Sequence, residues 1–366
     1  MPAKTDPAKT VLVASVAVLL GIGAVMIFST TARGDGSLVS STFVKQMIYV
    51  AMGLAAAIAL ARTDYHVITR HNRVILVVAL VLLVLVLVPG IGVRINGARR
   101  WIRVGPIGFQ PSEFAKLALL IWLAAFLAGK GDGVRSFKSA FAPVLVVVAA
   151  ACALILKEPD IGTSILLFAV AWIVLFAAGS RLVYLCAPIP AAVPLLFFLV
   201  SRGYAKERID AWIDPWKDPA QSGYHIIQSL IAIGSGGTWG VGLGASTQKL
   251  FFLPEASTDF IFAVLAEELG LVGVTVVLVL YAAFVWAGAS IARRAPDAEG
   301  MLLASGITSL IALQALINIG VVTQVLPTKG IPLPFISAGG SAAVFMLMGV
   351  GILYSIARSA NAEAAE

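Results

Sequence analysis

The sequence predicts an all-α integral membrane protein, built as one polytopic domain over residues 1–366. Of the 366 residues, 60% are hydrophobic and 12% are charged, whereas soluble globular domains carry about 25% charged residues. Apolar runs recur along the chain, and runs of roughly 17 to 25 residues are long enough to cross the ~30 Å hydrocarbon core of a bilayer as helices. The composition therefore excludes an ordinary soluble globule.

About ten of these runs are expected to be transmembrane helices. The first follows Lys4 and Lys9, and it is expected to be an uncleaved span, because its apolar part exceeds that of a signal peptide and no clear cleavage site follows. The seventh contains three prolines, so a kinked helix is expected there. The ten predicted spans are Val11–Phe28, Phe43–Leu60, Val74–Val88, Phe114–Ala128, Ala140–Leu156, Ile161–Ala178, Leu182–Val200, Phe260–Ala289, Met301–Val322 and Ala342–Ile356.

The charged and metal-binding residue types exclude several function classes. The net charge of +7 is spread over many loops, which favours contact with anionic head groups or phosphates and argues against nucleic acid. Cys152 and Cys186 lie inside apolar runs and form neither a disulfide framework nor a metal motif. His66, His71 and His225 do not cluster in the sequence, so no zinc site is expected.

The orientation in the membrane is not decided by charge. An even number of spans places both termini on one side. If that side is the cytoplasm, fewer of the 26 basic residues lie inside than outside, contrary to the positive-inside rule. Several of the outer ones belong to one long loop, where the rule counts for little.

A first unusual loop precedes the fourth span. Arg99, Arg100 and Arg103 could bind a phosphate through bidentate hydrogen bonds, and Trp101 is typical of the membrane interface. Equally, the segment fits cations that extend towards the head groups beside an interfacial aromatic residue. Both interpretations stay open on these residues alone.

Two further groups of charges lie at span ends. Glu113 and Lys116 are three residues apart at a predicted helix start, so they can form a local ion pair that is structural or lines a polar cavity. The turn Lys157–Asp160 joins two spans. It is either a solvated hairpin tip or the location of a functional carboxylate close to the hydrocarbon.

A long polar loop of about residues 201–259 separates the seventh and eighth spans. Its stretch Tyr224–Ile233 is half apolar and long enough for an interfacial helix. The glycine-rich stretch Gly234–Gly244 matches neither a Walker motif nor a dinucleotide-binding motif. A loop of this length without the composition of a disordered segment is more often functional than not.

The most informative stretch is Leu253–Phe262, which places the carboxylates of Glu255 and Asp259 at the start of a long apolar helix. Acids and bases gathered at one membrane face indicate a polar group presented there by a lipid. Asp259 has a plain alternative role as the N-cap of the eighth span.

Two neighbouring features also require a polar surrounding. Glu267 and Glu268 lie two turns inside the eighth span, so they need partners or a water-filled cavity. The stretch Thr323–Ser341 is rich in proline and glycine between two spans. Irregular backbone at that depth must be buried in protein or line a cavity.

Several motifs in the same order along the chain resemble the SEDS family, the FtsW, RodA and SpoVE proteins of cell division, elongation and sporulation. They cover nearly the whole chain, and their number and order make the resemblance specific. The motifs are Arg99–Trp101 with Gln110–Glu113, Asp214–Pro219, Ser222–Tyr224, Leu253–Ala263, Glu267–Gly270, and Leu326–Gly330 with Ser337–Ser341.

The resemblance implies a bacterial plasma-membrane protein with ten spans and cytoplasmic termini. It also implies peptidoglycan glycosyltransferase activity on lipid II, with a class B penicillin-binding protein as partner among other divisome or elongasome proteins. Gln248–Leu250 and Leu326–Gly330 look closer to the FtsW branch, whereas Ser257 and Ala338 depart from common family residues. A lipid II flippase and a noncatalytic scaffold for a penicillin-binding protein are the alternative functions.

The resemblance also assigns residues. It carries the role of general base onto Asp259, because a sugar hydroxyl needs a base to act as a nucleophile. Departing pyrophosphate requires positive charge, for which Lys329 and the loop arginines are candidates. A divalent cation could share this task, although no ligand set can be read from the sequence. The predicted substrate contacts are Lys329, Glu255, Arg99, Arg100, Arg208 and Lys249.

Overall fold

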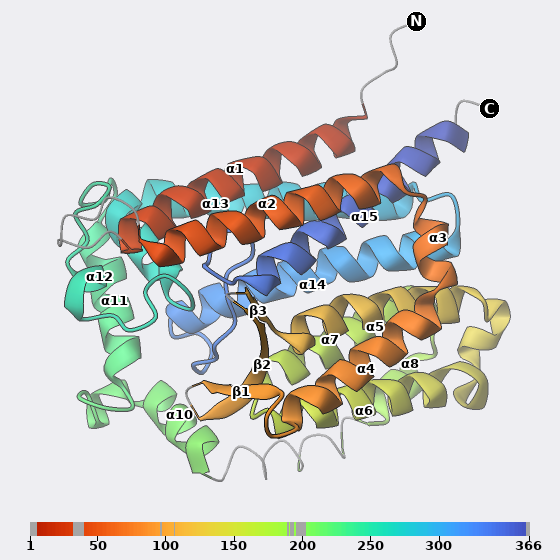
Figure 1. Ribbon diagram of the computed structural model, residues 1–366, viewed down its shortest axis with the longest axis horizontal. Coiled ribbons are helices and arrows are strands. Elements are labelled where there is room, and N and C mark those ends of the chain that lie inside the picture. Colours follow the sequence, from red (N-terminus) through yellow and green to blue (C-terminus); the bar gives the residue numbers. More distant parts are fainter. Residues whose placement is uncertain are drawn as a thin grey trace, which may run out of the picture.

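The computed structural model describes residues 6–31, 40–95, 97–105, 107–188, 190, 194 and 203–363, which are mostly helical (Figure 1). The long helices run side by side, and both ends of the described chain lie at the same end of the bundle. The helices of the first half are α1 (Pro7–Thr31), α2 (Ser41–Arg62), α3 (Tyr65–Arg70), α4 (Asn72–Leu87), α5 (Pro111–Ala128), η1 (Gly131–Arg135), η2 (Phe137–Phe141), α6 (Ala142–Lys157), α7 (Ile161–Ala177) and α8 (Leu182–Cys186). The helices of the second half are α10 (Gly203–Ile213), η3 (Pro215–Lys217), α11 (Tyr224–Gly236), α12 (Gln248–Phe251), α13 (Ile261–Arg293), α14 (Ala298–Val322) and α15 (Ser341–Glu363).

Apolar helices correspond to nine of the ten predicted spans. Two of them, α4 and α7, are shorter than the others. The predicted seventh span, Leu182–Val200, begins in α8 and then lies largely outside the described residues, so the total of ten remains a prediction. Within the described part of the chain, seven helices are long and apolar enough to cross a membrane: Pro7–Thr31, Ser41–Arg62, Pro111–Ala128, Phe137–Lys157, Ile261–Arg293, Ala298–Val322 and Ser341–Asn361.

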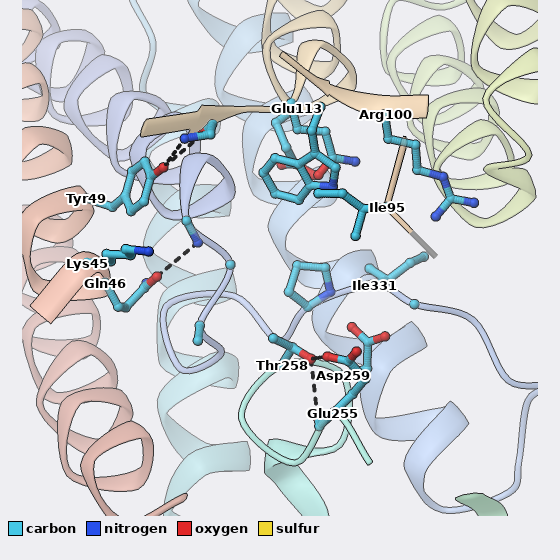
Figure 2. Close-up of a pocket in the computed structure, with 18 of the residues that line it drawn as sticks. Lys45, Gln46, Tyr49, Ile95, Arg100, Glu113, Glu255, Thr258, Asp259 and Ile331 are labelled. Carbon is cyan, nitrogen blue, oxygen red and sulfur yellow. Dashed lines mark hydrogen bonds between the residues drawn. The ribbon is translucent and has the colours of Figure 1, made fainter. Parts of the chain in front are cut away.

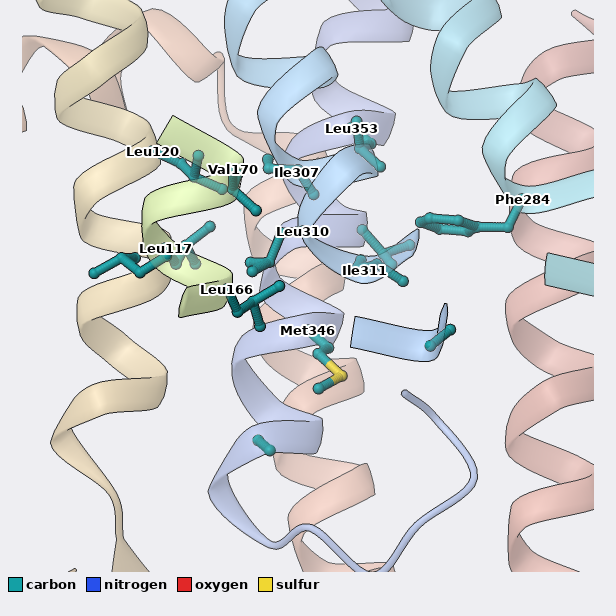
Figure 3. Close-up of a cluster of buried hydrophobic side chains, with 14 of the residues drawn as sticks. Leu117, Leu120, Leu166, Val170, Phe284, Ile307, Leu310, Ile311, Met346 and Leu353 are labelled. Carbon is teal, nitrogen blue, oxygen red and sulfur yellow. The ribbon is translucent and has the colours of Figure 1, made fainter. Parts of the chain in front are cut away.

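The apolar core forms around α14, which packs against α5, α7, α13 and α15. Ile307 and Ile311 of α14 are almost fully buried, as are Leu166 of α7 and Phe284 of α13 (Figure 3). Lipid tails are as apolar as these side chains, so the hydrophobic effect contributes little to helix association within the bilayer. Close van der Waals packing therefore holds the helices together. Glycines permit that packing: a Cβ at Gly351 of α15 would overlap the backbone of α2.

Helix α13 consists of two parts that meet at Gly270. This residue has φ 63° and ψ −164°, a conformation open to glycine and strained for other residues. Residues 261–268 are buried within the protein, whereas Leu271 and Val272 are exposed, 60% and 43% respectively. The first part therefore belongs to the protein interior, whereas the second part packs in the core along one face and exposes apolar side chains such as Leu271 and Val272 along the other.

A small antiparallel sheet precedes α5, in the stretch where the sequence predicts only a loop. Its strands β1 (Gly92–Ile95), β2 (Ala98–Val104) and β3 (Ile107–Phe109) pair in the order β1-β2-β3. Strand pairing satisfies backbone groups that would otherwise be costly near the hydrocarbon. The sheet thereby holds the loop arginines in fixed positions.

The long loop is largely ordered into short helices. Helix α11 covers the stretch for which an interfacial helix is predicted. Helix α10 docks onto the loop after α14 through a reciprocal contact, in which the Trp212 indole donates to the Gln324 carbonyl (2.9 Å) and the Gln324 amide donates to the Trp212 carbonyl (3.0 Å).

Candidate functional site

A cavity of about 580 Å³ lies at the end of the bundle formed by the sheet and the loop before α13. Figure 2 shows Lys45 and Tyr49 on one side of it, Arg100 on the other, and Glu255 and Asp259 below. The charged side chains of its wall are Lys45, Arg100, Arg103, Glu113, Lys116, Asp160, Glu255 and Asp259. Acidic and basic side chains therefore line the same polar cavity.

Asp259 sits in the turn that leads into α13, and the surrounding backbone is tied down. The Asn318 side-chain amide of α14 donates to the carbonyls of Asp259 and Ile331, both at 2.8 Å. The Ser337 hydroxyl donates to the Thr258 carbonyl at 2.6 Å. These bonds hold the carboxylate against the segment that contains Gly330, where a Cβ would come within 2.9 Å of Asp259 Oδ2.

The carboxylate of Asp259 does not cap the helix. Helix α13 begins at Ile261 with Phe260 as its N-cap, and no side chain makes a capping bond there. Burial raises the pKa of Asp259 to about 7, and the negative charge of Glu255 adds to this shift. At neutral pH the group is therefore poised between its acid and base forms.

Glu255 lies on the exposed rim of the cavity, one turn before Asp259. Its backbone adopts φ 55°, and its carboxylate accepts a hydrogen bond from the Thr258 hydroxyl at 2.8 Å. A non-glycine residue in this conformation is uncommon, and such conformations are concentrated at functional sites. The turn therefore brings two carboxylates to the same side of the cavity.

Arg100 joins the sheet to the turn between α6 and α7. Its guanidinium donates to the carbonyls of Glu158 (2.8 Å) and Pro159 (2.6 Å). The next residue, Asp160, accepts hydrogen bonds from the Thr163 amide and hydroxyl and also lines the cavity. Asp160 thus caps α7 and places its carboxylate in the cavity wall.

Glu113 and Lys116 form a buried ion pair with an Nζ–Oε1 distance of 2.8 Å, and both line the cavity. Lys116 also donates to the Gln314 side-chain carbonyl (2.9 Å), and the Gln314 amide donates to the Pro332 carbonyl (3.0 Å). The pair consequently connects α5, α14 and the loop after α14 in the part of the cavity wall that lies opposite Glu255 and Asp259 in Figure 2.

Other predicted contacts lie behind or away from the cavity wall. Lys329 lies next to Gly162. Burial, reinforced by the charge of Arg208, lowers the pKa of the Lys329 ammonium. Arg208 of α10 donates to the Thr328 carbonyl at 3.0 Å. Arg99 donates to the Leu87 carbonyl (3.4 Å) at the end of α4.

Lys249 makes its contacts outside the cavity. Its ammonium is 2.6 Å from Glu268 Oε1 and 2.7 Å from the Ser29 hydroxyl, so it joins the loop to α13 and α1. The structure therefore brings Asp259, Glu255, Arg100 and the Glu113 pair together, and gives Lys249 a partner elsewhere.

Helix α2 provides a further wall of the cavity, which none of the sequence motifs predicts. Lys45, Gln46 and Tyr49 of this helix line the cavity. The Gln46 side-chain carbonyl accepts from the Gly340 amide (2.9 Å), and the Tyr49 hydroxyl donates to the Gly108 carbonyl (2.9 Å). Polar residues within a predicted span are the signal that could have identified this wall.

A resident metal site has no support among the described side chains. In that part of the chain, no group of three or more His, Cys, Asp or Glu residues is placed to hold a metal ion.

The chain is similar to known proteins over nearly its full length. The FtsW/RodA/SpoVE family model, described as "Cell cycle protein", matches residues 10–362. The chain is 42% identical to stage V sporulation protein E of Bacillus subtilis, over 97% of this chain and 98% of that protein. It is 45% identical to the probable peptidoglycan glycosyltransferase FtsW of Geobacter metallireducens, over 85% and 84% of the two chains.

Solved structures show the same fold. A chain in the structure reported as "Structural coordination of polymerization and crosslinking by a peptidoglycan synthase complex" superposes with a TM-score of 0.79, at 30% identity over 95% of this chain and 97% of that chain. The rod shape determining protein RodA of Thermus thermophilus gives a TM-score of 0.71, at 28% identity over 95% and 96%. The chain belongs to the FtsW/RodA/SpoVE family of membrane proteins.

Proposed function

We propose that this protein is a peptidoglycan glycosyltransferase that polymerises lipid II into glycan strands, with Asp259 as the general base. The observation that carries the proposal is the Asp259 carboxylate in the wall of a cavity that is also lined by basic side chains, where burial raises the pKa of this carboxylate to about 7. A general base is most effective when its pKa is near the working pH. The relatives named as probable peptidoglycan glycosyltransferases support this reaction class.

The reaction requires one bond to form and one to break. A hydroxyl of the acceptor sugar attacks the anomeric carbon of the donor glycan, and its proton passes to the Asp259 carboxylate. The new glycosidic bond forms as the bond from the anomeric carbon to the lipid pyrophosphate breaks. The pyrophosphate leaves with the electron pair of that bond.

Positive charge on the cavity wall supports departure of the pyrophosphate. Arg100 and Arg103 come from the sheet and Lys45 comes from α2, and preorganised cations stabilise charge that develops as a bond breaks. Lys329 lies behind this wall, where it adds to the field without lining the cavity. Lys116 is already paired with Glu113 and contributes less net charge.

The lipid tail can remain in the bilayer while its head group occupies the cavity. Val44 and Ile48 of α2 are 46% and 50% exposed, whereas Lys45 and Gln46 of the same helix line the cavity. One helix thus separates a lipid-facing apolar surface from the polar space. We assign the entry of lipid-linked substrate to this side.

We also propose that both termini are cytoplasmic and that the cavity opens on the opposite side, where a class B penicillin-binding protein is the partner. The neighbouring structure of a peptidoglycan synthase complex supports that partner. Single cysteines at Lys138 and Lys217, probed in intact cells with an impermeant thiol reagent, test the orientation. We expect labelling of the cysteine at position 217 alone. Labelling at position 138 alone would show that the orientation is the reverse of the one proposed.

The decisive experiment compares Asp259→Asn with wild type in a lipid II polymerisation assay on purified, reconstituted protein. Asparagine keeps the shape of the side chain and removes its basicity, so polymer should be lost while folding and insertion are kept. Asp132→Asn, at an exposed position in η1, is the matched control. Near wild-type polymer from Asp259→Asn would remove the assignment of Asp259 as the base, whereas absence of polymer from the wild type would favour the flippase or scaffold function.

A further inference from the structure

An apolar group of side chains projects from the glycine-rich part of the long loop, between α11 and α12. Trp239 is 81% exposed, Val241 44% and Leu243 59%, and glycines alternate with them. Residues 239–243 are called the apolar tip below. Large apolar side chains that are exposed close together mark an interaction surface, whereas single exposed apolar residues are common.

The apolar tip is bonded to α13 at the break in that helix. The amides of Val241 and Gly242 donate to the carbonyls of Glu267 (2.9 Å) and Glu268 (3.1 Å). In the reverse direction, the Leu271 amide donates to the Gly237 carbonyl at 2.9 Å. The loop backbone therefore replaces the helical bonds that the break at Gly270 interrupts.

Side chains strengthen the same attachment. The Glu267 carboxylate accepts hydrogen bonds from the Ser246 hydroxyl and the Thr247 amide. The Glu268 carboxylate pairs with Lys249 at 2.6 Å. The two acids inside the predicted span thus have partners, and the loop cannot move without the first part of α13.

The depth of the apolar tip follows from the length of α13. The two parts of α13 together have 33 residues, which at 1.5 Å per residue amount to roughly 50 Å of helix, more than the ~30 Å hydrocarbon core requires. The part from Leu271 to Arg293 is enough to cross the hydrocarbon core by itself, since it is roughly 35 Å long at the same rise. Lipid-facing side chains also begin at Leu271. The break therefore lies at the boundary between hydrocarbon and head groups.

We propose that the apolar tip inserts into the head-group layer of the bilayer at the cavity face, with lipid as its partner. The tip is continuous with the lipid-facing surface that starts at Leu271, and tryptophan is favoured at membrane interfaces. Leucine and valine beside it add apolar area that anchors a segment at this depth.

The insertion has a consequence that rests on the proposed function. Asp259 lies in the turn before α13, and Ile261 at the start of the helix precedes Glu267 by roughly 9 Å along the helix axis. Because the tip is bonded to Glu267 and Glu268, and these residues follow Asp259 in one continuous buried segment, the position of the tip in the lipid constrains where Asp259 lies relative to the head groups. The base is thereby held at the level where a lipid presents its pyrophosphate and first sugar.

The test compares two tryptophans of the same loop. Trp216 is 66% exposed but lies among Asp214, Lys217 and Asp218, so it serves as the matched control. In a Cys152→Ala, Cys186→Ala background, Trp239→Cys and Trp216→Cys are labelled with an environment-sensitive fluorophore. The chain is then reconstituted without any partner into phosphatidylethanolamine and phosphatidylglycerol nanodiscs that carry a shallow doxyl quencher.

Strong doxyl quenching and several-fold weaker iodide quenching are expected at position 239, with the opposite pattern at position 216. Iodide access at position 239 equal to that at 216 would overturn the proposal. Protection of position 239 from both quenchers would also overturn it, because it would indicate a second protein copy as the occupant. Neither measurement depends on enzymatic activity.

A second measurement tests the consequence for Asp259. Trp239→Ser with Leu243→Ser should lower lipid II polymerisation several-fold in nanodiscs and little in detergent, where no bilayer sets the height; Trp216→Ser should change neither. Equal losses in both media would contradict the height-setting role. Absence of polymer from the wild type would instead refute the proposed function and leave the quenching result intact.

Discussion

The two ends of the bundle treat their charges differently. At the end that contains α3 and the start of α14, His66 bridges two carboxylates, at 2.8 Å to both Asp64 and Asp297, and Arg294 contacts Asp6 at 3.1 Å. At the cavity end, Asp259 lies close to another carboxylate and has a raised pKa. The first arrangement stabilises charged forms, whereas the second leaves a group free to exchange a proton.

The pKa shifts follow from these surroundings. Burial alone would lower the pKa of His66, but its bonds to Asp297 and Asp64 outweigh burial and raise it. Burial would raise the pKa of Asp297, but bonds from the Gly300 amide, His66 and Tyr65 outweigh burial and lower it. Asp259 has burial and a like charge acting in the same direction. Strong shifts of this second kind are typical of functional sites.

The largest expected effect concerns the buried ion pair between Glu113 and Lys116 in the cavity wall. Lys116→Met leaves the Glu113 carboxylate buried and unpaired, which should lower the free energy of unfolding by about 3–5 kcal/mol. Denaturant unfolding in mixed micelles measures it. Lys138→Met, at an exposed position, is the control.

The double variant Glu113→Gln with Lys116→Met removes both charges and should recover part of the stability. If the single variant is as stable as wild type, the pair does not stabilise the cavity wall. The raised pKa of Asp259 would then be the remaining difference in charge environment between the two ends of the bundle.

A smaller effect is expected at Lys329. Its ammonium supports the cavity field from behind the wall, so Lys329→Ala should lower polymerisation by roughly tenfold, below the loss for a donor in direct contact with developing charge. Lys329→Arg should restore activity only in part, because guanidinium and ammonium differ in geometry. Unchanged turnover of the alanine variant at normal protein yield would exclude Lys329 from the reaction.

The pH profile gives a finer measure of the cavity end. Because the ionised form of Asp259 is the base, polymerisation should rise with pH through about 7. Glu255→Gln removes the neighbouring negative charge, so the acid limb should move to lower pH. An acid limb unmoved by Glu255→Gln would contradict the proximity of the two carboxylates. The raised pKa also means that the contribution of Asp259 to folding stability falls as pH rises from 3.8 towards 7.

The smallest effect is expected at the opposite end. His66→Gln should lower unfolding stability by at most about 1 kcal/mol, because exposed ion pairs contribute little, and should leave polymerisation unchanged. The contribution of protonated His66 should be complete below its ordinary pKa of 6.5 and disappear as pH rises through the raised value. A loss of polymer in this variant would contradict the division between the two ends.

Much of the architecture could be predicted from the chain. The apolar runs located nine described helices, because a backbone in hydrocarbon must satisfy its own hydrogen bonds. The motif around Asp259 indicated the location of the site. The sheet before α5 was missed, since its strands are short and contain Arg99, Arg100 and Arg103, which also suit a polar loop.

The sequence by itself determined which segments enter the membrane and which acids and bases lie near its surface, because those properties depend on local composition. Only the tertiary structure decided which charges meet. Lys45 of α2 and Asp160 before α7 reach the cavity of Asp259, whereas Lys249, only ten residues from Asp259, pairs with Glu268. The rotation of each packed helix and the break at Gly270 set these contacts, and neither can be read from residue spacing.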